Sequence, residues 1–406
     1  MAQLRFGHQV ELLHSGKSFF PALVQAIDGS IHEVRLETYI FHFDDSGQKV
    51  AQALVRAAQR GVKVYLVVDG AGTPEFAPSL ARDFDAAGVN WRIFAPLGRV
   101  GLLLPSRWRR LHRKLCVVDG RMAFCGGINI LDDHLDPNHG ELNQPRLDFA
   151  VRVTGPLVHQ AHEAMAHFWW RLQTSSNVRS HDFAAVWRSI QDGLSMALRE
   201  WVDQEPWRKG RSAVGNTQAA LLLRDNLLHR GAIERAYRKA IGEAKQEIII
   251  ANAYFLPGRK LRQGLIHAAQ RGVKVRLLLQ GRYEYFMPYH AVRPVYDVLL
   301  AAGVEIHEYA PSFLHAKVAV VDGRWATVGS SNIDPLSLLL AREANVMVDD
   351  VEFALELRQH LEQAMAQDGR RIDPEVYAKR PWQLRVLDRL AFSLMRLALF
   401  LTGFRY

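Results

Sequence analysis

The chain has 406 residues, of which 49% are hydrophobic and 23% charged; this is the composition of a globular protein and excludes a largely disordered chain. Such a length suits two domains or one large one. The formal net charge of +9 favours an anionic partner, such as nucleic acid, a lipid surface or a phosphate-bearing substrate. The N-terminal residues carry no long apolar run, and no stretch of roughly 18 uncharged apolar residues follows. We therefore expect neither a signal peptide nor a membrane-spanning helix.

The only two cysteines are Cys116 and Cys125, and both lie within apolar segments. We expect them to be small core residues. The sequence offers no disulfide framework and no zinc-type cluster, which suits a reducing compartment.

Internal repeats organise the chain. An identical octapeptide, AAQRGVKV, occurs once in each half, preceded by an apolar segment and followed by a β-like run. The tetrapeptide AAGV then opens a further β-like segment in each half. In chain order, the matching segments are residues 34–43 and 248–256, 57–64 and 268–275, 64–68 and 275–279, and 86–89 and 301–304.

Both halves thus alternate strand and helix before a final buried strand. This alternation predicts an α/β fold of two tandem lobes, each a mostly parallel mixed sheet flanked by helices. We expect the first lobe to span residues 1–202 and the second residues 218–368, joined by a polar linker with Pro and Gly at residues 203–217. Residues 369–406 would form an amphipathic, membrane-associating tail.

The most informative repeat is LHRKLCVVDGRMAFCGGIN at residues 111–129, matched by LHAKVAVVDGRWATVGSSN at residues 314–332. Five polar or glycine positions recur at identical offsets in the two copies, so the match is not accidental. They are His112, Lys114, Asp119, Gly126 and Asn129 in the first copy, and His315, Lys317, Asp322, Gly329 and Asn332 in the second.

Side chains alternate along a strand, so the His and Lys of each copy point the same way from a rigid, buried element. The Gly-x-x-Asn segment brings an amide back towards them. If the lobes face each other, two imidazoles, two ammoniums and two carboxamides share one site that suits a phosphoryl group. One histidine could attack phosphorus while the other protonates the leaving alcohol. No acidic metal-binding cluster accompanies the site, so we expect no metal and no cofactor.

Four carboxylates near these motifs have distinct expected roles. Asp119 and Asp322 follow their lysines by five residues, so they face away from His and Lys and are interpreted as tying down the turn that follows. Asp148 and Glu343 each open a β-like run further along. They are candidates to hold the second ring nitrogen of a nucleophilic histidine, the alternative being that they are solvated acids at strand starts.

Three segments interrupt the repeat. Residues 97–111 combine an apolar tip, residues 100–104, with arginines, whereas only residues 312–314 occupy the same place in the second half. Residues 156–201 are expected to be helical, with tryptophans packed in a core or lobe interface. Residues 381–406 carry a broad apolar surface, which predicts an interfacial helix or, alternatively, a final helix packed on the body. Its polar stripe consists of Arg385, Asp388, Arg389 and Arg396.

These motifs resemble the phospholipase D superfamily, whose HxKx4D…GxxN signature occurs twice here. Within it, the chain is similar to bacterial cardiolipin synthases of the short B type, and the likeness covers nearly the whole chain. The resemblance implies two phospholipase D-like lobes with the active site at their interface. It also implies a catalytic set of His112, Lys114, Asp119, His315, Lys317 and Asp322, with Asn129 and Asn332 binding phosphate and Asp148 and Glu343 orienting the histidines.

The resemblance further implies a phosphatidyltransferase of phospholipid biosynthesis. A phosphatidyl group would pass from one phosphatidylglycerol to histidine, releasing glycerol, and then to a second phosphatidylglycerol. The expected partners are phosphatidylglycerol and an anionic membrane surface at the cytoplasmic face of the bacterial inner membrane, not nucleic acid. The alternatives are a phospholipase D hydrolase, another phosphodiesterase such as a nuclease, or an inactive membrane adaptor. The sequence assigns neither the nucleophilic histidine nor the oligomeric state.

Overall fold

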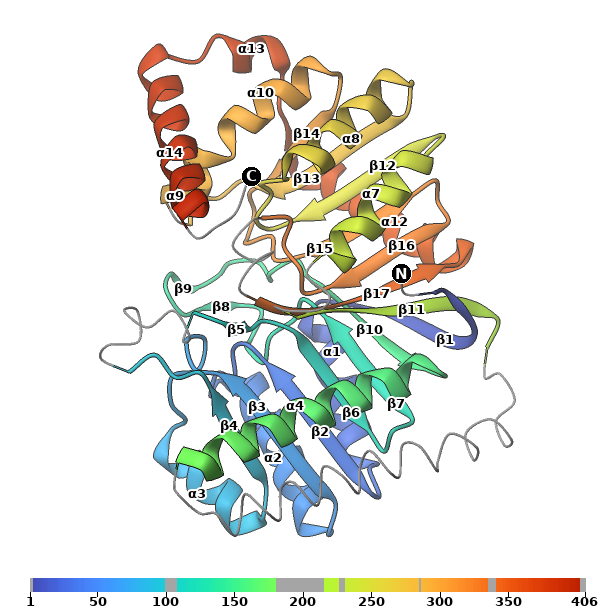
Figure 1. Ribbon diagram of the computed structural model, residues 1–406, viewed down its shortest axis with the longest axis vertical. Helices are drawn as coiled ribbons and strands as arrows, with labels where there is room; N and C mark the ends of the chain where they lie inside the picture. The colour runs from blue at the N-terminus through green and yellow to red at the C-terminus, as the bar shows by residue number, and fades with distance from the viewer. Residues whose placement is uncertain are drawn as a thin grey trace.

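The computed structural model describes residues 3–98, 108–179, 215–225, 231–284, 286–334 and 341–401. It contains two lobes, one above the other in Figure 1, with β1 and β11 running between them. The predicted helical extension beyond residue 179 and the predicted linker up to residue 214 lie outside the described residues. The division at residues 203–217 therefore remains a prediction.

The first lobe alternates strands and helices as the repeat predicts. Its elements are β1 (Arg5–His14), α1 (Ser15–Asp28), β2 (Glu33–Thr38), α2 (Asp45–Gln59), β3 (Lys63–Asp69), α3 (Pro78–Ala87), β4 (Asn90–Phe94), β5 (Arg110–Leu111), β6 (Lys114–Val118), β7 (Met122–Gly126), β8 (Leu135–Asp136), β9 (Gly140–Glu141), β10 (Phe149–Thr154) and α4 (Leu157–Arg179).

The second lobe repeats this order and adds helices at its C-terminal end. Its elements are β11 (Thr217–Arg224), α7 (Ala232–Glu243), β12 (Glu247–Asn252), α8 (Arg259–Gln270), β13 (Lys274–Gln280), α9 (Phe286–Ala291), α10 (Arg293–Ala301), β14 (Glu305–Tyr309), β15 (Lys317–Val321), β16 (Trp325–Gly329), β17 (Ala341–Asp349), α12 (Val351–Gln367), β18 (Gly369–Arg371), α13 (Pro374–Ala378) and α14 (Trp382–Leu401).

The α/β class and the two lobes are confirmed, but the prediction of mostly parallel sheets is wrong. Within the described residues, the helix-connected strands pair in parallel, β2 with β3 and β3 with β4, repeated as β12 with β13 and β13 with β14, and so do the short β5 and β17. The strands that carry the motifs, β6 and β15, join antiparallel to β2 and β12. They continue through hairpins into β7 and β16.

Turn geometry explains these hairpins. Asp119 and Gly120 have φ of 51° and 60°, and Asp322 and Gly323 have φ of 52° and 59°. Two consecutive residues with positive φ make the tight turn that Asp-Gly favours, and such a turn joins antiparallel strands. A parallel return would instead need a crossover helix.

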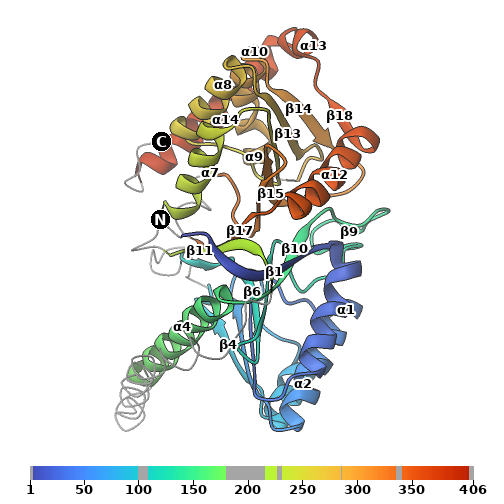
Figure 2. The ribbon, with the colours of Figure 1, turned by 90° about the vertical axis from the view of Figure 1, so that its right-hand side faces the viewer.

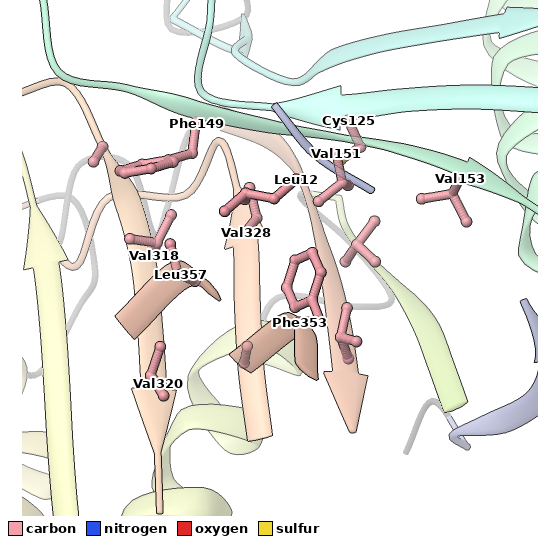
Figure 3. Packing of buried hydrophobic residues seen from close by; sticks show 14 of the residues in the cluster. Leu12, Cys125, Phe149, Val151, Val153, Val318, Val320, Val328, Phe353 and Leu357 are labelled. Atoms are coloured by element: carbon pink, nitrogen blue, oxygen red, sulfur yellow. The ribbon is translucent and has the colours of Figure 1, made fainter. Parts of the chain in front are cut away.

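The two lobes share one hydrophobic core. β1 pairs with both β10 and β11, so the lobes form a single 16-stranded sheet. Figure 3 shows Phe149 and Val151 of the first lobe packed near Val318, Val328 and the α12 side chains of the second. Each such fully buried side chain contributes about 2 kcal/mol of hydrophobic stabilisation. The relative position of the lobes therefore follows from shared burial and not from a tether alone.

Helices cover the outer faces of the lobes (Figure 2). Trp169 of α4 packs edge-on against Tyr65 with ring centroids 5.0 Å apart, beside a small core that includes Leu111 and Phe168. This placement matches the expected packing role of the helix.

Cys116 and Cys125 are buried free thiols, and burial raises the pKa of Cys125 to about 12.

At the C-terminal end, β18 pairs with β14, and α14 packs on α9 and α10. Within the part of the chain that the structure describes, no helix is both long and apolar enough to cross a bilayer.

Replacing Gly126 by Ala should destabilise the fold. A Cβ at this position would lie 2.4 Å from Ala150 Cα and 2.5 Å from the Phe149 carbonyl oxygen, so the β7–β10 pair must shift. We expect a loss of about 1–3 kcal/mol in the free energy of unfolding, measured by denaturant titration. Gly242→Ala is the matched control, because a Cβ there meets nothing within 4 Å. In this helical position it should stabilise the protein by about 0.5–1 kcal/mol. Equal effects of the two substitutions would contradict this account.

Candidate active site

The two motif histidines are held by backbone contacts with the opposite lobe. β5, which ends one residue before His112, pairs in parallel with β17, and the His112 N–H donates to the Arg342 carbonyl at 3.0 Å. In the same way, the His315 N–H donates to the Leu147 carbonyl at 2.9 Å. Each histidine is thus placed by a strand of its own lobe and fixed by a neighbour from the other.

The imidazole rings are held by carboxylates across the same boundary. His112 Nδ1 lies 3.0 and 3.1 Å from the two carboxylate oxygens of Glu343. His315 Nδ1 lies 2.6 Å from Asp148 Oδ2. Both carboxylates are buried, with exposed fractions of 0% and 2%. With Nδ1 engaged, the Nε2 atom of each ring is the one left to meet a substrate.

The two imidazole–carboxylate pairs are supported differently. Ser330 Oγ donates to Glu343 at 2.5 Å, and the corresponding residue of the first motif is Gly127. A Cβ at Gly127 would lie 2.2 Å from Asp148 Oδ1. Glycine therefore makes room for one carboxylate where serine holds the other.

Burial also gives these groups different protonation properties. Burial raises the pKa of Asp148 to about 7, although Lys317 opposes the shift. Burial would raise the pKa of Glu343 too, but the charge and hydrogen bond of His112, with Lys114 and Ser330, bring it below its usual value. Burial lowers the pKa of His112, opposed by Glu343. It lowers the pKa of His315 further, with Lys317 and Lys114 adding to the effect.

The motif lysines lie beneath the histidines. Lys114 Nζ donates to the His112 carbonyl at 2.8 Å, and Lys317 Nζ donates to the His315 carbonyl. Burial and the neighbouring Lys317 lower the pKa of Lys114 to about 7. Burial lowers the pKa of Lys317 to about 8, against the raising effect of Asp148 and Glu343. An anion bound here would be favoured, because it restores the charged form of both lysines.

The motif asparagines are buried at the same place. Asn129 Oδ1 accepts a hydrogen bond from the Ile40 N–H at 3.2 Å. Asn332 Oδ1 is buried and has no hydrogen-bond partner among the described residues. A buried amide oxygen without a partner is costly, so a ligand hydroxyl is a suitable donor for it.

These groups surround one cavity of about 670 Å³ between the lobes. Both histidines and both asparagines line it. Among the described residues, no group of three His, Cys, Asp or Glu side chains could hold a metal ion. The predicted site residues from two distant segments are therefore brought to one place, apart from the two motif aspartates.

Asp119 and Asp322 lie outside this cavity, which separates them from the catalytic set in which the resemblance places them. The Asp119 carboxylate accepts hydrogen bonds from the backbone N–H groups of Ile31, His32 and Glu33. Asp322 does the same for residues 245–247. They hold the turn before β2 and β12, and not the following turn as predicted, because the antiparallel pairing lays the end of the motif strand beside the start of β2 or β12.

Several cavity residues were missed by sequence reasoning. The Tyr39 ring contacts the His112 ring in a tilted arrangement, with ring centroids 5.0 Å apart. The Tyr254 hydroxyl donates a hydrogen bond to the Glu284 carboxylate at 2.7 Å. Both tyrosines belong to the repeated apolar segments, so their recurrence was an available signal. Arg146, two residues before Asp148, also lines the cavity. Glu284 carries no comparable pattern.

The arginine-rich insertion contributes to the cavity from its C-terminal end. Trp108 and Arg110 line the cavity, and Arg110 Nη1 binds the buried Asp69 at 3.0 Å. Asp69 also accepts from the Leu111 N–H at 2.6 Å, which anchors the start of the motif. The predicted apolar tip, residues 100–104, lies outside the described residues, as do Arg99 and Arg107.

Comparison with known proteins gives a consistent family. A family model described as cardiolipin synthase, PLD-like domain, matches residues 23–165 and 237–365. The chain is 38% identical over 392 residues to cardiolipin synthase B of Salmonella typhi, covering 97% of this chain and 89% of that protein. The identity to cardiolipin synthase B of Escherichia coli K12 is 37% over the same length and coverage.

A solved structure shares the fold. Phosphatidylserine synthase of Haemophilus influenzae aligns with a TM-score of 0.63 at 14% sequence identity, covering 96% of this chain and 93% of that one. At this identity, the similarity concerns the fold alone.

Replacing Asp119 by Ala should lower the stability of the folded protein and leave its catalytic activity unchanged. Loss of an acceptor for three backbone N–H groups should lower the free energy of unfolding by about 1–2 kcal/mol. Those N–H groups hold the pKa of Asp119 below its usual value, against burial. Its contribution is therefore complete above the pKa of the unfolded side chain and is lost as the pH falls through the folded pKa. Denaturant titrations at neutral and acidic pH would measure this.

The control for a catalytic role is Lys114→Ala, which should abolish turnover in folded protein. Activity is compared under conditions in which the Asp119→Ala variant is fully folded. If it were then as inactive as Lys114→Ala, the structural role that we assign to Asp119 would be wrong.

Proposed function

The chain belongs to the family of cardiolipin synthases with phospholipase D-like domains, and on that premise we propose that it transfers a phosphatidyl group between two molecules of phosphatidylglycerol. The products would be cardiolipin and glycerol, and the intermediate a phosphatidyl-histidine. The observation that carries this proposal is the pairing of each imidazole with a buried carboxylate from the opposite lobe around one cavity.

In the first step, Nε2 of one histidine attacks phosphorus, forming a P–N bond as the P–O bond to the glycerol headgroup breaks. The second histidine, as imidazolium, gives its proton to the departing glycerol oxygen. The proposal is supported by the held Nδ1 atoms, because a carboxylate at Nδ1 stabilises positive charge on the ring while Nε2 reacts.

In the second step, the now neutral second histidine takes the proton from a headgroup hydroxyl of another phosphatidylglycerol. That oxygen attacks phosphorus, the P–N bond breaks, and the first histidine is regenerated. Lys114, Lys317, Asn129 and Asn332 would bind the phosphoryl oxygens. The low pKa values of the lysines support this role, since they gain charge when an anion arrives.

The setting that we propose for this reaction is the cytoplasmic face of the bacterial inner membrane, with the protein bound peripherally. The support is the C-terminal helix, in which Trp382, Leu390 and Leu394 are 66%, 56% and 57% exposed. The diacyl substrate resides in a bilayer, so an apolar surface close to the cavity is useful to such an enzyme.

The function is tested by incubating purified protein with vesicles containing phosphatidylglycerol that is labelled in the headgroup glycerol. We expect labelled cardiolipin and labelled free glycerol in equal amounts, separated by thin-layer chromatography. Phosphatidic acid and glycerol without cardiolipin would identify a hydrolase that uses water as acceptor. No turnover of the lipid would contradict the proposal altogether.

The mechanism predicts that His112→Ala and His315→Ala each reduce transfer by roughly a thousandfold or more, because nucleophile and proton donor act as a unit. Asp148→Asn and Glu343→Gln should also reduce turnover strongly, with the histidines still in place. His267→Ala is the matched control, since this exposed histidine lies on the outer surface of α8, and it should retain full activity. Near-normal transfer by either His112→Ala or His315→Ala would refute the two-histidine site.

A further inference from the structure

A second cavity, of about 480 Å³, lies between α8, α10 and α14. Four arginines line it: Arg259, Arg262, Arg389 and Arg396. The other lining residues are apolar, including Val298 and Phe392, and no acidic side chain lines it. The Arg396 guanidinium carbon lies 5.8 Å from the centre of the Phe392 ring. We refer to this as the arginine cavity.

Other arginines in this part of the fold have a structural role, because they form ion pairs with nearby carboxylates. Arg293 is paired with Glu308, and Arg380 is paired with Asp297 and Asp388. Among the described residues, none of the four arginines of the arginine cavity lies within 4.0 Å of a carboxylate oxygen. Four cations that converge without a counter-ion suit an anionic ligand.

The surrounding helices add to the positive potential. α8 begins at Arg259 and α10 at Arg293, and neither has a side-chain cap or an acidic residue in its first turn. Both Arg259 and Pro294 line the arginine cavity. The amino ends of two helices therefore lie beside it, and helix amino ends favour negative charge.

The third helix around the arginine cavity is α14, whose orientation is fixed by a buried ion pair. Asp388 lies 2.8 Å from His290 Nδ1 and 3.0 Å from Arg380 Nη1. Asp388 is only 4% exposed, so it belongs to the packed face and not to the predicted polar stripe. The opposite face presents an exposed apolar row beside the arginines. This row consists of Trp382, Val386, Leu390, Leu394 and Leu397.

The same helix also borders the active site. Met395 lines the cavity that holds the two motif histidines, and the next residue, Arg396, lines the arginine cavity. Whatever binds beside α14 therefore lies close to the cavity that contains the two histidines. Figure 1 shows α14 at the edge of the second lobe, against α9.

We propose that the arginine cavity binds the phosphate-bearing headgroup of an anionic phospholipid in a membrane, while the apolar row of α14 enters the bilayer interface. A membrane is the one occupant that supplies both a phosphate and an adjoining apolar layer. The inference rests on the proposed function for the identity of this surface, a bilayer that carries the substrate. It adds a lipid site distinct from the catalytic cavity, which docks the enzyme with its active site facing the lipid.

The test uses the full chain with Arg259→Gln, Arg262→Gln, Arg389→Gln and Arg396→Gln combined. Binding is measured by flotation with phosphatidylcholine vesicles, with and without phosphatidylglycerol. Each basic residue at an anionic surface strengthens binding roughly fivefold. We therefore expect the variant to bind anionic vesicles weaker by roughly two to three orders of magnitude. Arg389→Gln with Arg396→Gln alone should give an intermediate loss, and serves if the fourfold variant does not fold.

The matched control removes the same charge elsewhere, as Lys63→Gln, Arg82→Gln, Arg121→Gln and Lys274→Gln, all exposed. Three of these charges lie on the first lobe and one at the start of β13, and none lines the arginine cavity. Salt screens charges that are far from the bound surface, so the binding of this control should change by less than about threefold. An equal loss in the control would reduce the effect to overall charge and overturn the proposal. Unchanged binding of the arginine variant to anionic vesicles would overturn it as well.

A second readout separates this site from the proposed function. With a short-chain phosphatidylglycerol that is soluble without a bilayer, the arginine variant should transfer at the wild-type rate, because its catalytic cavity is untouched. Loss of this activity in the variant would place the arginines in the reaction and refute a docking role. Inactivity of the wild type on both substrates would refute the proposed function, while the vesicle measurement still decides the docking site.

Discussion

The pairing of each imidazole with a carboxylate from the opposite lobe is the interaction on which the rest of this structure depends. Neither lobe contains a complete site, because His112 needs Glu343 and His315 needs Asp148. The pairs form only if the lobes meet in one register. The β1–β11 pairing and the shared core around Phe149 and Val328 hold that register, and a shift of an ångström would break hydrogen bonds of 2.6–3.1 Å.

The active site buries two imidazoles, two ammoniums and two carboxylates close together. This burial raises the free energy of the folded state, since each charge loses its hydration. As a consequence, the pKa values of both lysines are lowered and that of Asp148 is raised, so that all three lie near pH 7 to 8. A bound phosphate offsets part of this free energy, because its negative charge stabilises the charged form of the lysines. The desolvation of these buried groups therefore favours binding of a phosphodiester, and the oxygen of Asn332, unpaired in the described structure, can accept a hydrogen bond from a hydroxyl of the same ligand.

The C-terminal helix links this chemistry to the surface. α14 is held by Asp388 on one side and exposes leucines on the other. It therefore combines the two interpretations that the sequence left as alternatives, a packed helix and an interfacial one. Its consecutive residues Met395 and Arg396 line two different cavities, so one element borders the active site and, as we propose, attaches the protein to the membrane.

The sequence by itself determined the local features: the two motif copies, the strands that carry them, the common direction of each His and Lys, and the two carboxylates as orienting candidates. These follow from periodicity and from covalent neighbours, which any reader of the sequence has in hand. Only the tertiary structure decided which carboxylate serves which histidine, because that depends on the register across the β1–β11 junction. It also decided that Asp119 and Asp322 brace the fold, through antiparallel pairing set by Asp-Gly turns. The arginine cavity could not be predicted, since its residues come from three separate helices, of which α8 and α14 lie more than a hundred positions apart, and only packing brings them together.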